Sequence, residues 1–258
     1  MKIEKAILKI CPPAQKLPIQ YHYQKFRRRL EKELFLVERF FSRGKRAIDV
    51  GANLGIYSYV MSQYFEVVEA FEPQFWCTEN LKAYSEGHQE KIRIHHVGLS
   101  NCNESLKLHI PFSDNDYSIL VPSLGKVVSG LGSFRELEEE SASVEVPVRK
   151  LDDYHFTDVS FIKIDVEGYE SKVIEGGRET LLREKPIIFV EIEQKHLEDK
   201  NIEEVFEEIK SLGYEGNFFW RDKLKPLSEF SYAIHQQPFL DKPSGEDYIR
   251  NFIFKPIG

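Results

Sequence analysis

The sequence predicts an α/β protein built on a doubly wound, mainly parallel β-sheet. Short buried-strand patterns alternate with helix-length segments through most of the 258 residues. Parallel strands need crossover connections, and helices supply them, so this alternation indicates helices on both faces of the sheet. The length and the apolar content of 41% also suit one large domain with a packed core.

The chain opens with a predicted N-terminal helical segment, residues 1–45, which precedes a predicted α/β domain at 46–258. Within 21–43, apolar residues recur every three or four positions, the period of a helix with one buried face. Gly44 is expected to end this helix. The apolar positions are Phe26, Leu30, Leu34, Val37 and Phe41.

The alternation then begins, and each element follows from its local pattern. Strands are expected at 46–51, 67–73, 91–99, 105–111, 144–151, 159–166 and 186–193, and helices at 53–65, 75–86, 169–184 and 201–212. Near the C-terminus, 214–220 and 248–254 are expected to form an antiparallel hairpin at one sheet edge, joined by a polar connection rather than a helix. The irregular stretch 111–143 is an insertion between strands, as expected of a lid or a binding loop.

Charge and cysteine content limit the class of ligand and the compartment. The formal charge is −7 and the sequence pI is about 5.7, which argues against a nucleic-acid substrate and favours a small molecule. Cys11, Cys77 and Cys102 are odd in number and far apart, so we expect reduced thiols. No apolar run is long enough for a membrane span or a secretory signal. We therefore expect a soluble, cytoplasmic protein.

A glycine-containing turn between the first strand and the first helix of the domain is the strongest candidate for ligand binding. The strand ends at Asp49 and Val50, and the turn carries Gly51 and Gly55 just before the helix. Backbone amides at a helix N-terminus favour anionic or polar ligands, and glycine lets a ligand approach. Asn53 occupies a position that tolerates positive φ. Tight strand-to-helix turns also use glycine for steric reasons alone, which is the alternative explanation.

Glu72 strengthens the nucleotide interpretation, because it ends the second strand 17 residues after Gly55. At that spacing an acidic residue reaches ribose hydroxyls in nucleotide-binding α/β folds. Asp49 beside the turn would repel a pyrophosphate, and the third glycine of the dinucleotide pattern is missing. A carboxylate there suits a ligand with an ammonium group, such as S-adenosylmethionine. An NAD-dependent oxidoreductase and a non-catalytic nucleotide-binding partner protein are the alternatives.

Several segments in order along the chain resemble the FkbM family of S-adenosylmethionine-dependent O-methyltransferases, a class I methyltransferase family. They are IDVGANLGIYS, AFEP, VGLSN, RKLDDY, FIKIDVEGYESKVIEGG and FVEIEQKH, within about 46–196. The resemblance implies seven strands with the last inserted antiparallel, and S-adenosylmethionine as the cofactor. It implies Asp49, Gly51, Asn53 and Gly55 around the methionyl part, Glu72 on the ribose, and Val97, Gly98, Leu99 and Ser100 near the adenine. The predicted cofactor set also includes Ala52, Tyr57 and Asp165.

The catalytic groups are expected at the carboxyl ends of the fourth and fifth strands, where open α/β sheets bind ligands. Asp165, Glu193 and His196 are the candidates for a general base that removes a hydroxyl proton. Histidine has the ordinary pKa closest to neutrality, although His196 could instead be an exposed residue that begins the next helix. Period-two alternation places Lys163 and Glu191 as neighbours, which favours a structural ion pair.

A magnesium site is the alternative route to an activated hydroxyl. Asp165, Glu167 and a carboxylate of the fifth strand offer the oxygen ligands that this ion prefers. Nothing in the spacing requires the metal, so the prediction is a metal-free O-methyltransferase. The expected acceptor is a hydroxyl of a small molecule or glycan, on a sugar of a surface glycan or on a secondary metabolite.

Overall fold

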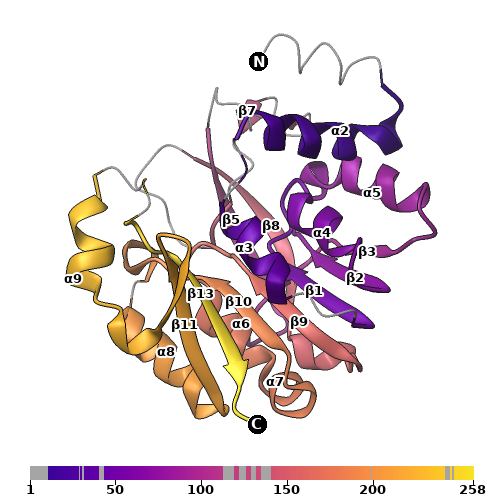
Figure 1. The fold of residues 1–258 in the computed structure, drawn as a ribbon. Helices are drawn as coiled ribbons and strands as arrows, with labels where there is room; N and C mark the ends of the chain where they lie inside the picture. Colours follow the sequence, from indigo (N-terminus) through magenta and orange to yellow (C-terminus); the bar gives the residue numbers. More distant parts are fainter. Residues whose placement is uncertain are drawn as a thin grey trace.

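The computed structural model contains an eight-stranded mixed sheet in the order β12-β11-β13-β10-β9-β1-β2-β3 (Figure 1). The structure describes residues 11–28, 30, 32–40, 44–112, 119–121, 126–128, 132–134, 141–197, 199–241, 245 and 247–258. Five neighbouring strands are parallel: β3 (Ile92–His95), β2 (Val67–Phe71), β1 (Arg46–Val50), β9 (Val159–Ile164) and β10 (Ile187–Glu191). The predicted mainly parallel sheet is confirmed.

The C-terminal strands form the antiparallel part of the sheet. β13 (Asn251–Pro256) lies between β10 and β11 (Tyr214–Trp220) and is antiparallel to both. β12 (Lys223–Pro226) adds an eighth strand at the edge, so the predicted antiparallel pair lies inside the sheet. The connection contains α9 (Tyr232–His235) between the short turns η5 (Leu227–Glu229) and η6 (Gln237–Phe239). The expectation of a connection without a helix was therefore wrong.

Helices cover both faces of the sheet, which confirms the doubly wound arrangement (Figure 1). One layer contains α2 (Pro13–Phe26), α3 (Lys32–Val37), α4 (Ile56–Met61) and α5 (Glu79–Glu86), with the short turns η1 (Glu38–Phe40) and η2 (Phe75–Cys77). The other contains α6 (Glu170–Gly176), α7 (Arg178–Glu184) and α8 (Ile202–Ser211). Phe161 and Phe189 pack with the first layer, whereas the adjacent Ile162 and Ile188 pack with the second. This alternation follows from the two-residue period of a strand.

The predicted N-terminal helix at 21–43 is not continuous. α2 already begins at Pro13, a residue favoured in the first helical turn. It ends at Phe26, which is 84% exposed, and Arg28 adopts a left-handed φ of 52°. The helix is thus interrupted, and Leu34 of α3 packs in the same hydrophobic cluster as Leu17 of α2. Apolar periodicity predicted helix in both parts, but the exposed Phe26 shows that it did not mark one continuous buried face.

A small second sheet, β4-β8-β5, lies beside the main one and carries the insertion. Its strands are β4 (Gly98–Leu99), β5 (Glu104–Pro111) and β8 (Ser141–Arg149), so the strand expected at 91–99 is divided between two sheets. Within 111–143, β6 (Ile119–Val121) pairs antiparallel with β7 (Lys126–Val128), and Ser133 bridges to His109. These parts are not irregular; 113–118, 122–125, 129–131 and 135–140 lie outside the described residues.

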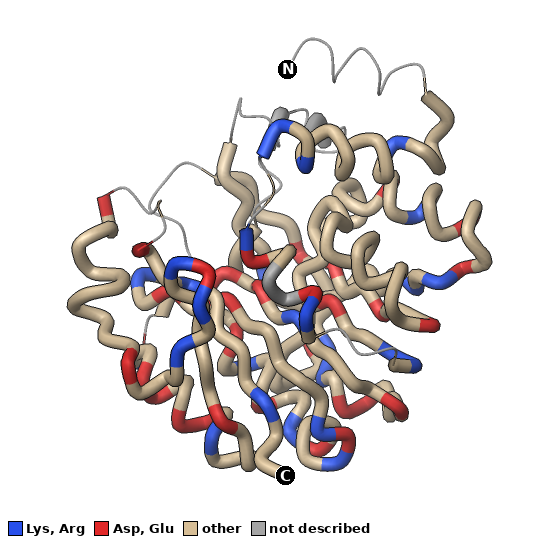
Figure 2. The backbone as a smooth tube through the Cα atoms, in the orientation of Figure 1, with Lys and Arg blue, Asp and Glu red and all other residues tan. Residues whose placement is uncertain are grey.

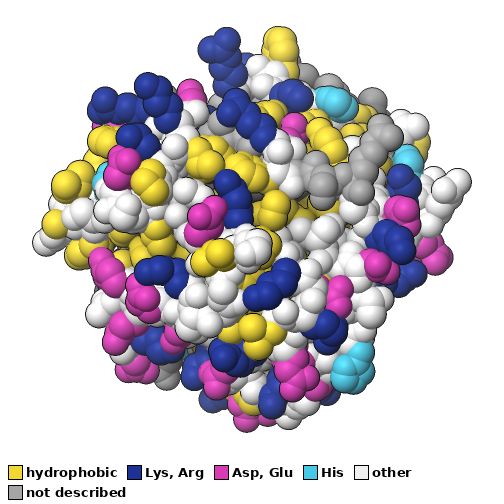
Figure 3. Space-filling view, turned by 60° about the horizontal axis from the view of Figure 1, so that its bottom comes forward, with side chains coloured by type: hydrophobic (Ala, Val, Ile, Leu, Met, Phe, Trp, Pro, Cys, Tyr) yellow, Lys and Arg dark blue, Asp and Glu magenta, His cyan; other side chains and the backbone are white. Residues whose placement is uncertain are grey.

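The charged residues of the described chain are of mixed sign, and its cysteines are free. Lys and Arg residues are spread among Asp and Glu residues along the described chain (Figure 2). Side chains of both signs are also interspersed on the face seen in Figure 3. Cys11, Cys77 and Cys102 are free thiols. Among the described helices, none combines the length and the apolar character that crossing a membrane requires.

Candidate active site

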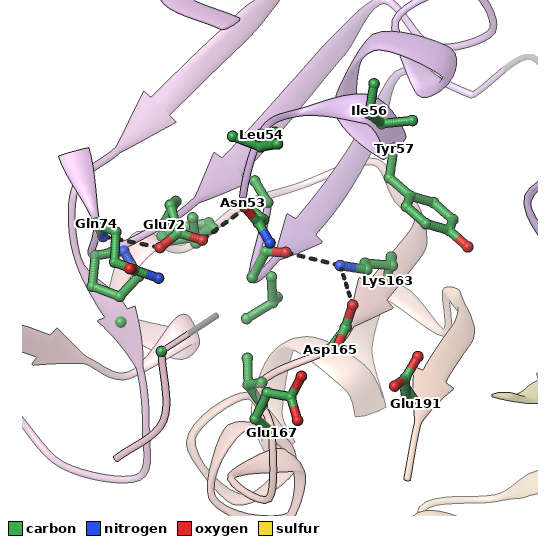
Figure 4. A pocket seen from close by; sticks show the side chains of 18 of the residues that line it. Asn53, Leu54, Ile56, Tyr57, Glu72, Gln74, Lys163, Asp165, Glu167 and Glu191 are labelled. Atoms are coloured by element: carbon green, nitrogen blue, oxygen red, sulfur yellow. Dashed lines mark hydrogen bonds and ion pairs between the residues drawn. The ribbon is translucent and has the colours of Figure 1, made fainter. Parts of the chain in front are cut away.

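A cavity of about 400 Å³ opens at the carboxyl ends of the parallel strands, where the sequence predicted the site (Figure 4). The loops after β1, β2 and β9 and the last residue of β10 form most of its wall, and residues from the N-terminal segment and the insertion contribute to the rest. Its lining includes Gln24, Leu30, Leu34, Gly51, Ala52, Asn53, Leu54, Ile56, Tyr57, Phe71, Glu72, Gln74, Gly98, Leu99, Leu108, Gly132, Phe134, Lys163, Asp165, Glu167, Glu191 and Arg250.

The turn after β1 has the left-handed backbone that its sequence predicted, with φ of 74° at Gly51, 48° at Asn53 and 84° at Gly55. A Cβ atom at Gly51 would lie 1.9 Å from the backbone oxygen of Asp165, and one at Gly55 would lie 2.7 Å from the Leu81 side chain. Packing within the protein is therefore sufficient by itself to require both glycines.

Glu72 fastens this turn to the end of β2. Its carboxylate accepts a hydrogen bond from the backbone amide of Asn53 at 2.8 Å and another from the backbone amide of Gln74 at 2.9 Å. The residue is 3% exposed, and burial raises the pKa of its carboxyl to about 7, although both amides and Lys163 favour the charged form. Glu72 lines the cavity while it holds the loop in place, so one side chain combines the two tasks.

Lys163 of β9 connects two carboxylates beneath the same turn. Its Nζ lies 3.5 Å from Asp49 Oδ1 and 3.2 Å from Asp165 Oδ2, and it donates to the Gly51 carbonyl oxygen at 2.8 Å. Asp49 is fully buried and accepts a hydrogen bond from Ser58 at 2.5 Å. Asp49 therefore lies behind the turn, and Asp165 is the carboxylate of this group that lines the cavity.

Eight predicted cofactor residues line the cavity: Gly51, Ala52, Asn53, Tyr57, Glu72, Gly98, Leu99 and Asp165. Four others, Asp49, Gly55, Val97 and Ser100, are not among its lining residues. Val97 packs against the hydrophobic core, and the backbone amide of Ser100 donates to the Arg149 carbonyl at 2.9 Å. These four support the wall from behind.

An aromatic side chain from the insertion closes one side of the cavity. The Phe134 ring packs so closely over Gly98 that a Cβ there would lie 2.7 Å from it. Phe134 also contacts the Tyr169 ring, with centroids 4.9 Å apart. The sequence predicted an insertion able to cover a ligand but did not single out Phe134. The glycine at position 98 is the only local signal, since it leaves room for a ring.

The predicted catalytic residues separate into two groups. Asp165 lines the cavity, whereas Glu193 and His196 do not. Glu193 is 4% exposed, accepts a hydrogen bond from the Tyr248 hydroxyl and forms an ion pair with Lys195 at 2.9 Å. His196 is not an exposed residue that begins a helix: it ends the turn η4 (Gln194–His196), and its side chain is only 18% exposed.

Two other carboxylates join Asp165 at the cavity wall. Figure 4 shows Glu167 and Glu191 near Asp165, away from Glu72. Glu191 forms an ion pair with Arg250 at 3.2 Å. Arg250 was missed by the sequence analysis, although it precedes β13, whose antiparallel direction brings its start to this edge of the sheet. Within the described residues, no three His, Cys, Asp or Glu side chains form a group that could hold a metal ion.

Comparisons with known proteins agree with this architecture. The structure resembles that of methyltransferase FkbM from Methylobacillus flagellatus, with a TM-score of 0.51 and 18% identity over 83% of this chain and 44% of that one. This chain therefore spans less than half of that protein. A precorrin 8w decarboxylase from Methanobacterium thermoautotrophicum is less similar, with a TM-score of 0.45 and 9% identity over 88% of this chain and 90% of that one. An rRNA methylase from Streptococcus thermophilus has a TM-score of 0.42 and 9% identity over 88% of this chain and 95% of that one.

A match between the sequence and a family model identifies the family of this chain. No curated protein matches the chain. The family model described as the methyltransferase FkbM domain matches residues 49–215, which is more than half of the chain. That range contains the turn after β1, Glu72 and the carboxylates after β9 and β10, and it therefore covers most of the cavity wall. The chain belongs to the FkbM methyltransferase family.

Proposed function

We propose that this protein transfers a methyl group from S-adenosyl-L-methionine to a hydroxyl of a small molecule or glycan. The acceptor hydroxyl belongs to a sugar of a surface glycan or to a secondary metabolite. The observation that carries the proposal is the composition of one cavity. Glu72 and the turn after β1 form one part of its wall, and Asp165, Glu167 and Glu191 form another. On this proposal, the groups that bind the nucleotide and those able to accept a proton lie in one site.

The residues around the turn fit S-adenosylmethionine. Asp49 and Asp165 flank the single cation Lys163, so this group has room for a second positive charge, which the ammonium of the methionyl part would provide. Asp165 would receive it, because Asp165 lines the cavity and Asp49 does not. Asn53 Oδ1 is buried without a hydrogen-bond partner and would accept a hydrogen bond from the ligand.

Glu72 would accept hydrogen bonds from the ribose hydroxyls, and Gly98, Leu99 and Phe134 would enclose the adenine. Each oxygen of Glu72 accepts one backbone amide, which leaves acceptor capacity on both. S-adenosylmethionine supplies a methyl group that is already electrophilic on its sulfonium. The protein therefore has to hold an acceptor in line and exclude water.

The remainder of the cavity suits a compound rich in hydroxyl groups. Glu167 and Glu191 are hydrogen-bond acceptors when ionised, so they match hydroxyl donors, while Arg250 supplies donors to sugar oxygens. Leu30 and Leu34 of the N-terminal segment provide an apolar wall. We infer that this segment, predicted as a separate unit at 1–45, helps to form the acceptor side of the domain at 46–258.

Two measurements test the function. Titration calorimetry with S-adenosylhomocysteine and with NAD should show binding of the former alone; binding of NAD alone would favour the oxidoreductase alternative. Glycans and small-molecule extracts are then incubated with protein and S-adenosylmethionine, and mass spectrometry should detect a gain of one methyl group. Cofactor binding without methylation of any compound would favour the non-catalytic alternative. We also infer a cytoplasmic location, which the three free thiols support.

A further inference from the structure

Glu167 adopts a backbone conformation that a glutamate rarely takes. It follows β9 within the segment Asp165–Gly168, and its φ is 52°, in the left-handed region. Such a conformation persists only where the surroundings fix it, and it is concentrated at functional sites. Glu167 lines the cavity, so the unusual backbone directs a carboxylate to the place where an acceptor would bind.

Two neighbours hold this backbone in place. The Ser133 hydroxyl, from the insertion, donates to the Glu167 carbonyl oxygen at 3.1 Å. The Glu170 carboxylate accepts a hydrogen bond from the Gly168 backbone amide at 3.0 Å, and Glu170 is only 2% exposed. The position of Glu167 is therefore set by both the insertion and the start of α6.

His196 fixes the side chain of Glu167 from behind. Its Nδ1 lies 3.0 Å from Glu167 Oε2, and its own backbone amide donates to the Glu193 carbonyl at 2.9 Å. When Nδ1 carries a hydrogen, this N–H would donate a hydrogen bond to the carboxylate. Since Glu167 lines the cavity and His196 does not, the carboxylate is the member of the pair that an acceptor can reach.

The surroundings also keep this carboxylate basic. Burial raises the pKa of Glu167 to about 7, and the negative charges of Asp165, Glu193 and Glu170 act in the same direction, while Lys195 opposes them. A general base is most effective when its pKa lies near the working pH. Asp165 already contacts Lys163 at 3.2 Å, and Glu193 is buried against Tyr248 and Lys195.

We propose that Glu167 is the general base that removes the acceptor's hydroxyl proton, and that His196 is a positioning residue that orients the Glu167 carboxylate. The inference rests on the proposed function. The hydroxyl proton passes to the Glu167 carboxylate, and the hydroxyl oxygen uses its electron pair to bond the methyl carbon. The bond between that carbon and sulfur breaks, its electrons stay on sulfur, and S-adenosylhomocysteine leaves as a neutral thioether.

The first test measures S-adenosylhomocysteine formation with a panel of hydroxyl compounds, including glycerol, methyl glucoside and uridine diphosphate glucose. Glu167→Gln should lower turnover with the best acceptor by about 100-fold or more, with unchanged affinity for S-adenosylhomocysteine. Glu179→Gln, at an exposed position of α7, is the matched control. Turnover of Glu167→Gln within about threefold of wild type would overturn the base role.

The second test separates positioning from simple structural support. The wild-type turnover should rise with pH through an apparent pKa near 7, and this limb should be absent in Glu167→Gln. His196→Ala should lower turnover and raise the pKa of the limb, because a donor to the carboxylate is lost. His196→Asn, which retains a donor, should restore both. An unchanged pH profile in His196→Ala would overturn the positioning role.

The same measurements distinguish this inference from the proposed function. A wild-type protein that binds S-adenosylhomocysteine but methylates no hydroxyl compound in the panel would overturn the proposed function and the base role together. An active wild type with an equally active Glu167→Gln would overturn the base role alone. A large loss at Asp165→Asn with none at Glu167→Gln would move that role to Asp165.

Discussion

Glu72 accepts the backbone amide proton of Asn53 at 2.8 Å, so the end of β2 holds the turn that follows β1. The second oxygen of the same carboxylate accepts a hydrogen bond from the Gln74 backbone amide at 2.9 Å. A residue predicted only as a ribose ligand therefore also maintains the shape of the site. This dual task changes what its substitution should do.

Glu72→Ala should weaken S-adenosylhomocysteine binding by about 1.5–3 kcal/mol, the range for hydrogen bonds to a charged group. It should also destabilise the unliganded protein by about 1–3 kcal/mol, since two backbone amides lose their acceptor. Calorimetry and urea denaturation measure the two effects. Glu86→Ala, at an exposed position of α5, should change neither. Wild-type binding by Glu72→Ala would place the nucleotide elsewhere.

Glu170→Gln should make stability less dependent on pH. The pKa of Glu170 is raised from its ordinary 4.5 to about 7, chiefly by burial, so the folded state binds this proton more tightly than the unfolded chain. The resulting stabilisation is fully present below a pH of about 4.5 and is lost as the pH rises through about 7. Glu72 and Glu167 act in the same direction.

The glutamine oxygen can still accept the Gly168 amide proton, so the backbone is kept while the ionisation is removed. Urea denaturation at a series of pH values should therefore give a smaller loss of stability from about pH 5 to about pH 8 in Glu170→Gln than in wild type. Glu86→Gln should follow the wild-type curve. Parallel curves for Glu170→Gln and wild type would show that this carboxyl does not titrate as its burial implies.

Gly51→Ala should lower the free energy of unfolding of the protein even when no ligand is bound. Its Cβ would lie 1.9 Å from the Asp165 carbonyl oxygen, in a backbone with a φ of 74°. Gly213→Ala is a matched control, because Gly213 has a φ of 84° but only the end of Lys185 nearby. The control should cost about 1–2 kcal/mol for the left-handed backbone, and Gly51→Ala should cost clearly more. Equal losses in urea denaturation would show that the close contact relaxes freely.

The order of elements was predictable because it depends on local patterns. Ile48 of β1 and Ile162 of β9 lie in the hydrophobic core. The short apolar runs that contain them alternate with helix-length segments in the sequence. Strand alternation predicted Lys163 beside Glu191, whereas Lys163 forms an ion pair with Asp165, just after β9, at 3.2 Å, and Glu191 forms one with Arg250 at 3.2 Å. The turn with Gly51 was recognisable from its composition, although its glycines serve internal packing.

The partners of individual side chains were less predictable, because they depend on tertiary contacts. Glu167 and His196 are brought together across β9 and β10 only by the turn η4. Spacing marked both as polar residues after strands but could not show which of them reaches the cavity. The break between α2 and α3, beyond which Leu34 lines the cavity, was hidden for a related reason: apolar periodicity continues on both sides of it.

Phe134→Ala tests whether the insertion contributes to cofactor binding. The sequence predicted a lid or a binding loop at 111–143, and Phe134 of this insertion packs over Gly98 and lines the cavity. Removing the ring should therefore weaken S-adenosylhomocysteine binding by about 1 kcal/mol or more, since an aromatic contact and its buried area are lost. Phe75→Ala is the control, because Phe75 is 56% exposed and does not line the cavity. If Phe134→Ala instead keeps full affinity in calorimetry and only raises the KM for the acceptor, the insertion covers the acceptor alone, and the adenine is enclosed by Gly98 and Leu99 without it.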